Sequence, residues 1–163
     1  MKTQGRFGGG ETLRLFVALP LPADARDRLA RWQAESLAEA TRGARLVPPE
    51  NLHVTLAFLG RRPVAEVDAV VDEMRGAASG CDRPTLTATG YRETRSVGMV
   101  VFDDDEGRAA RLFERLAAGL ERIGVYERES RAWLPHVTVL RFHERPRLSP
   151  PPPSLGAVSP SEV

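Results

Sequence analysis

The feature that most constrains the fold of this chain is a strand–helix–strand pattern that occurs twice. Strands are expected where apolar and β-branched residues run together, and helices where apolar residues recur every three or four positions. The predicted elements are residues 13–19, 23–40 and 52–59 in the first half, and 97–102, 107–123 and 134–142 in the second. The first strands of the two halves begin 84 residues apart. Two half-domains related by pseudo-symmetry are the simplest explanation of this repeat.

A further helix and strand connect the two halves, and less regular segments flank them. Residues 64–78 carry apolar side chains on one helical face, and residues 86–91 alternate as a strand does. We expect residues 1–11, which include three consecutive glycines, to form a flexible extension. Residues 12–145 are predicted to form a single bilobal domain. Residues 146–163 contain four consecutive prolines, and we interpret this Pro-rich segment as a stiff connector.

Each half carries a histidine at the start of its second strand, within the same short motif. Residues 53–56 read His-Val-Thr-Leu and residues 136–139 read His-Val-Thr-Val, so the second histidine stands 83 positions after the first. Side chains two positions apart on a strand point to the same face, so each histidine faces the same way as its threonine. If the two strands lie side by side about the pseudo-axis, two imidazoles and two hydroxyls converge on one cleft.

Two imidazoles across a cleft can divide the work of proton transfer. With ordinary pKa values near 6.5, one can be neutral and accept a proton while the other is protonated and donates one. Phosphodiester cleavage needs such a pair, and the hydroxyls of Thr55 and Thr138 can donate to non-bridging phosphate oxygens. We therefore interpret His53 and His136 as catalytic, although spacing does not say which is the acid. His143 lacks the motif and is interpreted as a surface residue.

Composition narrows the class of protein further. A chain of 163 residues with 42% apolar residues can support a single core without disulfides or a structural metal. A net charge of +1 argues against coating long nucleic acids, which requires a marked basic excess, but allows a small phosphorylated ligand. The sequence has no membrane-spanning apolar run and no signal-peptide pattern, which predicts a cytoplasmic location. Cys81 is the only cysteine, and no short His or acidic cluster predicts a metal site.

These motifs resemble those of a known enzyme family. The doubled His-x-Thr-x is similar to that of the 2H phosphoesterase superfamily. Residues 49–60, which read Pro-Glu-Asn-Leu-His-Val-Thr-Leu-Ala-Phe-Leu-Gly, resemble its bacterial and archaeal RNA 2′,3′-cyclic phosphodiesterases, historically called 2′-5′ RNA ligases. Residues 13–19 resemble the opening strand of that family, and residues 135–141 its second motif. Where the family commonly has Trp, this chain has Leu46. Trp133 lies three positions before His136. A Trp at such a position is more often a core residue than a platform for a base.

The resemblance implies an α+β, bilobal, pseudo-symmetric fold, with two antiparallel sheets flanking a central active-site groove and helices outside. It also implies opening of a terminal 2′,3′-cyclic phosphate to a 2′-phosphate without a metal or another cofactor. On this resemblance His53 is the proton donor and His136 the proton acceptor. Thr55 and Thr138 hold the phosphate, and Arg141 contacts the phosphate or the nearby nucleotide. The implied partner is RNA with a 2′,3′-cyclic phosphate end. We expect a monomer with no membrane association and no obligate protein partner.

Three other functions are compatible with the same motifs. Joining of RNA ends through a 2′-5′ linkage uses the same two histidines in the reverse direction. A binding module that holds phosphorylated RNA ends without turnover is disfavoured, because permanently charged Arg would serve it better than His. Hydrolysis of small cyclic nucleotides is the third. Identifying the product formed from an oligonucleotide that ends in a 2′,3′-cyclic phosphate distinguishes these functions.

Overall fold

The computed structural model describes residues 10–40 and 42–160, which form three α-helices and seven β-strands. Residues 1–9 of the predicted extension, residue 41 and the last three residues of the Pro-rich segment lie outside the described residues. The helices are α1 (Ala23–Ser36), α2 (Val67–Ser79) and α3 (Arg108–Arg122). The strands are β1 (Thr12–Pro20), β2 (Ala44–Leu46), β3 (His53–Pro63), β4 (Leu86–Glu93), β5 (Val97–Asp104), β6 (His136–Phe142) and β7 (Ala157–Val158).

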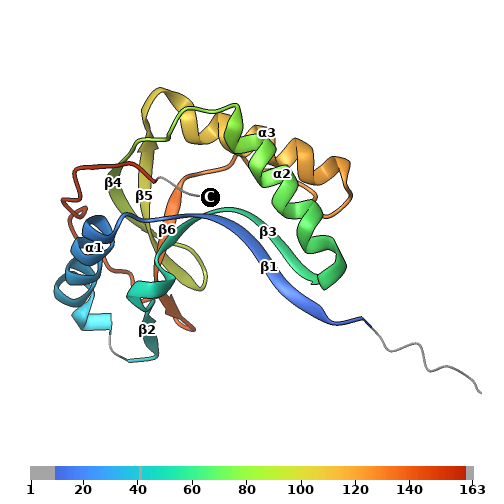
Figure 1. Cartoon of the computed structure of the whole chain (residues 1–163). Helices are drawn as coiled ribbons and strands as arrows, with labels where there is room; N and C mark the ends of the chain where they lie inside the picture. The colour runs from blue at the N-terminus through green and yellow to red at the C-terminus, as the bar shows by residue number, and fades with distance from the viewer. Residues whose placement is uncertain (1–9, 41, 161–163) are drawn as a thin grey trace, which may run out of the picture.

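All strand pairs are antiparallel, and the strands follow the order β1-β3-β6-β5-β4-β7, with β2 added to β6 (Figure 1). β1 and β3 form one block, and β2 with β4 to β7 forms the other. One pair, Val54 with Val137, joins β3 to β6 and thereby joins the two blocks. The two predicted antiparallel sheets are therefore two lobes of one hydrogen-bonded sheet.

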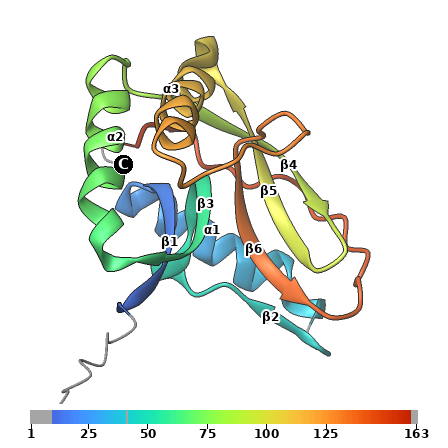
Figure 2. The same ribbon diagram turned by 90° about the vertical axis from the view of Figure 1, so that its right-hand side faces the viewer.

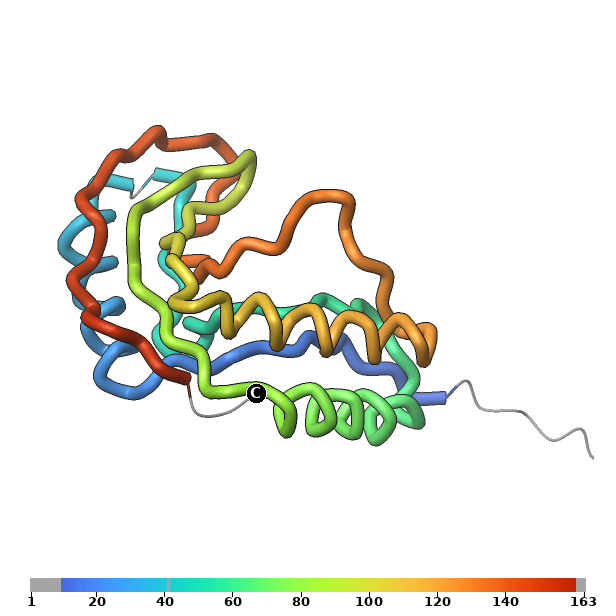
Figure 3. The backbone as a smooth tube through the Cα atoms, turned by 90° about the horizontal axis from the view of Figure 1, so that it is seen from above, coloured from blue at the N-terminus to red at the C-terminus, as the bar shows by residue number. Residues whose placement is uncertain are grey.

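The helices cover one face of this sheet and leave the other face open. α2 and α3 lie side by side over β1 and β3, and α1 lies at the opposite end of the molecule, beside β4 (Figures 1 and 3). α3 is strongly amphipathic, and its inward side chains Leu112, Leu116 and Leu120 are at most 2% exposed. Burial of such side chains supplies the main driving force for packing helices onto the sheet.

The structure departs from the predicted elements mainly at their ends. α1 stops at Ser36, four residues early, because Ala38–Ala40 form a 3-10 turn. α2 begins at Val67, after a 3-10 turn over Val64–Glu66. β2 was not predicted, since three residues are too few to show a period.

The described part of the Pro-rich segment packs on the body instead of acting as a connector. Leu155 and Val158 are 4% and 1% exposed, and β7 pairs with β4. The indole Nε1 of Trp32 on α1 donates to the carbonyl of Pro151 at 3.0 Å. In Figure 3 the segment, coloured red, runs past α1 towards α2. Because a run of prolines lacks the alternation that marks a strand, this packing could not be predicted from the residues alone.

Candidate active site

The two histidine motifs meet where the lobes join. β6 lies between β3 and β5 (Figure 2). Val54 and Val137, which pair across β3 and β6, are fully buried. Because the strands are antiparallel, the residues beside this pair oppose one another, so His53 lies opposite Thr138 and Thr55 opposite His136. All four side chains are half-buried and point away from the core. The structure thus brings the four residues predicted from the motifs onto one face.

Both motif strands bulge directly after the threonine. The register slips by one residue after Thr55 against β1 and after Thr138 against β5. The two residues after each threonine are buried, and the next residue is exposed; this next residue is Phe58 on β3 and Arg141 on β6. The sequence of buried and exposed positions is the same over the first seven residues of the two strands. The bulges return Phe58 and Arg141 to the face that carries the histidines.

The ring of His136 is held by the backbone just before it. Its Nδ1 lies 2.8 Å from the carbonyl oxygen of Leu134. A carbonyl oxygen only accepts, so Nδ1 carries the proton in this contact and Nε2 is left to exchange a proton with substrate. This arrangement suits a group that accepts a proton when the ring is neutral.

His53 has a more apolar environment. Its ring stacks on Phe16, with ring centroids 4.9 Å apart and planes 20° apart. Burial lowers the pKa of His53, and the charges of Arg141 and His136 lower it further, while a hydrogen bond to the backbone of Asn51 acts in the opposite direction. Both histidines thus contact the backbone two residues before them. The charge of Arg141 thus acts on His53, which agrees with the exposed position of Arg141 on the same face.

Two phenylalanines that sequence reasoning missed line the same face. Phe16 and Phe58 are 47% and 58% exposed, with ring centroids 5.8 Å apart. Exposed aromatic rings are suited to stacking on nucleobases. In the sequence they read as ordinary strand residues. The signal that reveals Phe58 is the internal repeat, because it stands five positions after His53, as Arg141 does after His136.

Two side chains, the half-buried Trp133 and the buried Gln33, fasten the motif strands. The indole Nε1 of Trp133 donates to the carbonyl of Thr55 at 3.1 Å, and its ring stacks on Phe113 of α3 at 5.2 Å. Trp133 therefore packs against the core, as expected, and it ties the loop before His136 to the first motif. Gln33, 2% exposed, donates to the carbonyls of Val47 at 3.1 Å and of the bulge residue Val139 at 2.7 Å.

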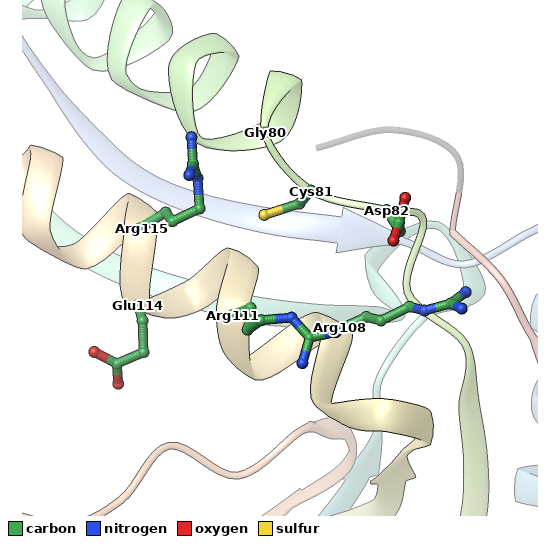
Figure 4. Close-up of a pocket in the computed structure, with 7 residues that line it drawn as sticks. All are labelled: Gly80, Cys81, Asp82, Arg108, Arg111, Glu114 and Arg115. Atoms are coloured by element: carbon green, nitrogen blue, oxygen red, sulfur yellow. The ribbon is translucent and has the colours of Figure 1, made fainter.

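A charged pocket lies away from these motifs. It has a volume of about 380 Å³ between the end of α2 and α3 (Figure 4), and it is lined by Gly80, Cys81, Asp82, Arg108, Arg111, Glu114 and Arg115. Its arginines are largely engaged, since Arg108 pairs with Glu106 at 2.7 Å and Arg115 donates to carbonyls of α2. The pocket lining contains no histidine, and we place no activity there. His143, interpreted as a surface residue, is exposed.

Two kinds of feature are absent from residues 10–40 and 42–160. No group of three or more His, Cys, Asp or Glu side chains is placed to hold a metal ion. No helix in this part of the chain has the length and apolar character needed to cross a membrane.

Comparisons with known proteins agree with this geometry. The family model described as LigT like Phosphoesterase matches residues 19–96. An RNA 2′,3′-cyclic phosphodiesterase of Thermus thermophilus is 32% identical over 158 residues, covering 92% of this chain and 78% of the relative. A protein of the same name from Escherichia coli is 32% identical over 148 residues, covering 87% and 79%. The crystal structure of E. coli LigT complexed with 3′-AMP superimposes with a TM-score of 0.75 at 28% identity, covering 91% of this chain and 84% of that one.

Proposed function

We propose a function from the premise that this chain belongs to the LigT-like phosphoesterase family of the 2H superfamily. The predicted family and the predicted α+β antiparallel fold are thereby confirmed. The chain is an RNA 2′,3′-cyclic phosphodiesterase, an enzyme that hydrolyses cyclic phosphate ends of RNA. Its product is a 2′-phosphomonoester.

One observation carries the mechanism: each histidine lies opposite the threonine of the other motif. A phosphorus atom held between the two threonine hydroxyls would have one imidazole on either side of it. In-line displacement needs a base beside the attacking oxygen and an acid beside the departing oxygen, on opposite sides of the phosphorus. The pseudo-symmetric pairing of β3 and β6 supports this arrangement.

In the proposed reaction His136 accepts a proton from water through Nε2 as the water oxygen bonds to phosphorus. The bond between phosphorus and the 3′ oxygen breaks, and His53 donates a proton to that oxygen. The phosphate stays on the 2′ oxygen, and the 3′ hydroxyl is restored. The water proton ends on His136 and the His53 proton on the product, so return of the enzyme to its first state moves one proton back through solvent.

The threonines and Arg141 act on the charge of the phosphate. The hydroxyls of Thr55 and Thr138 donate to the non-bridging oxygens, where negative charge resides throughout the reaction. Arg141 is exposed on the histidine face and supplies a fixed positive charge for the phosphate or nucleotide. Phe58 occupies the equivalent position in the other lobe, and its exposed ring is suited to stack on the terminal base.

The test is the product formed from a short oligonucleotide ending in a 2′,3′-cyclic phosphate, incubated in EDTA. We expect a 2′-phosphate end at a rate unaffected by the chelator. A 3′-phosphate product, or activity that EDTA abolishes and a divalent ion restores, contradicts the mechanism. A joined RNA supports the ligation alternative, and binding without turnover supports the binding module. The cytoplasmic location and monomeric state stay predictions.

A further inference from the structure

Two arginines oppose each other across β1 and β3, beyond the phenylalanines. Arg14 pairs with Arg61 in the antiparallel ladder. Directly opposed residues have Cβ atoms about 5 Å apart, and like charges at that spacing destabilise the strand pair. The like charges therefore do not stabilise this strand pair, and their placement calls for another explanation.

Both arginines point to the face that carries the histidines. The register shifts fall on β3, so β1 alternates without interruption and Arg14 lies on the same face as Phe16. Phe16 stacks on His53, which fixes that face as the site face. Arg61 pairs with Arg14, and its Nη1 lies 3.4 Å from the hydroxyl of Thr12, the next residue of β1 on this face.

Arg14 and Arg61 differ from the neighbouring Arg62, which forms an ion pair with a carboxylate. Arg62 points to the helix side, where its Nε lies 2.7 Å from a carboxylate oxygen of Glu66. Arg14 and Arg61 are exposed, and neither forms an ion pair with a carboxylate of the described residues. Two guanidinium groups that have no carboxylate partner among residues 10–40 and 42–160, on one face of a nucleic-acid enzyme, are suited to bind phosphate.

The spacing along β1 relates the pair to the active site. Same-face residues of an antiparallel strand lie about 7 Å apart, so Arg14 is roughly 7 Å from Phe16 and roughly 14 Å from Ala18, the partner of Thr55. The order on this face is reacting phosphate, aromatic pair, arginine pair. Figure 1 shows β1 and β3 continuing side by side away from β6 in this direction.

From these observations, and on the basis of the proposed function, we propose that Arg14 and Arg61 form a second phosphate subsite. It binds an internucleotide phosphate of the RNA just upstream of the reacting end. The enzyme then distinguishes an RNA chain from a single nucleoside 2′,3′-cyclic phosphate. A modest overall charge of +1 is compatible with this, because the cations are gathered on one face.

The experiment compares two substrates and two variants. The substrates are adenosine 2′,3′-cyclic phosphate and a short oligoadenylate that ends in the same cyclic phosphate. The test variant is R14Q/R61Q. The control is R31Q/R75Q, which removes the same charge from two exposed arginines on α1 and α2, the helices on the other face of the sheet. Thermal unfolding checks that each variant is folded, and R14Q/R61Q is expected to be at least as stable as the wild type because a like-charge pair is removed.

We expect R14Q/R61Q to lower kcat/KM for the oligoadenylate at least about 10-fold, the effect of removing one charge-assisted hydrogen bond, and for the mononucleoside less than about twofold. The dependence of log kcat/KM on log salt concentration for the oligoadenylate should flatten by about 0.7 for each phosphate that the variant no longer neutralises. The control should change neither substrate.

Equal losses on both substrates, no loss on either, or an equal loss in the control would overturn the subsite. If the wild type hydrolyses neither substrate, the proposed function fails, and the subsite is then judged by binding of labelled oligoadenylate. About 10-fold weaker binding by R14Q/R61Q would still support it, and unchanged binding would refute it.

Discussion

At the scale of single residues, the two histidines share a motif but not an environment. His53 is stacked on Phe16 and lies near Arg141, and these surroundings disfavour its charged form. His136 is anchored through the carbonyl of Leu134. A proton donor with a lowered pKa is more acidic than usual, and this favours transfer to the departing oxygen once substrate has brought in negative charge.

This difference predicts the pH dependence. The pKa of His53 in the free enzyme lies below its ordinary value of 6.5. As the pH rises through this lowered pKa, the protonated fraction of His53 falls, and kcat/KM falls with it. Bound cyclic phosphate is negative and stabilises the imidazolium, so the alkaline limb of kcat should lie at higher pH than that of kcat/KM. NMR titration of His53 tests the free-enzyme value. R141Q removes one positive charge that lowers the pKa of His53, so it should raise the midpoint of this titration. A wild-type titration midpoint above 6.5 would contradict this account.

Removal of one threonine hydroxyl should weaken catalysis without abolishing it. Thr55→Val or Thr138→Val deletes one hydrogen bond to a charged oxygen, about 1.5–3 kcal/mol, or roughly 10–150-fold in rate if the bond is made in the transition state. Single-turnover rates measure this loss. Thr85→Val is a control, because the half-buried Thr85 hydroxyl bonds to the hydroxyl of Ser159, next to the paired ends of β4 and β7. Wild-type rates in both motif variants would remove the threonines from the phosphate site.

At the scale of elements, the strands that carry the motifs were the most predictable part of the chain. The apolar runs around residues 52–59 and 134–142 and the repeated His-Val-Thr located both. The bulges were not predictable, because strand alternation alone assigns Phe58 to the face opposite His53. β2 and β7 have three and two residues and depend on pairing with distant strands, so local sequence carries too little information to reveal them.

The loop before His136 should act on catalysis through its anchor on β3. Trp133→Phe keeps an aromatic ring against Phe113 and removes the Nε1 donor to the Thr55 carbonyl. We expect kcat to fall on the order of 10-fold, with a smaller change in KM, because small displacements of catalytic groups are costly. Trp32→Phe is the matched control, since it removes the indole donor on α1 that bonds to the Pro151 carbonyl. An equal effect of both variants on kcat would refute a positioning role for Trp133.

At the scale of the whole molecule, the pseudo-symmetric halves followed from the repeat and the single core from the length and apolar content of the chain. The role of the C-terminal segment followed from neither. Its prolines indicated an extended chain, but whether that chain leaves the body or packs on it depends on contacts with α1 and β4. The face that carries the histidines was also only partly foreseeable. The motifs placed four polar side chains on it, and the register added the phenylalanines.

The packed segment should contribute to global stability. Leu155→Ala removes a side chain that is 4% exposed and should lower the free energy of unfolding by about 2–5 kcal/mol. Ser154→Ala, at an exposed neighbouring position, should change it by less than about 0.5 kcal/mol. Urea unfolding measures both. A Leu155→Ala effect as small as that of Ser154→Ala would show that the segment does not belong to the cooperative core.

The account depends most on His53 and His136 acting together as acid and base. The direct test is single-turnover cleavage of an oligonucleotide with a 2′,3′-cyclic phosphate end by H53A, H136A and the double variant, each shown to be folded. We predict that each single variant loses about 10²–10⁴-fold and that the double variant loses little more, because both proton transfers belong to one step. Near wild-type cleavage by both single variants would contradict the account.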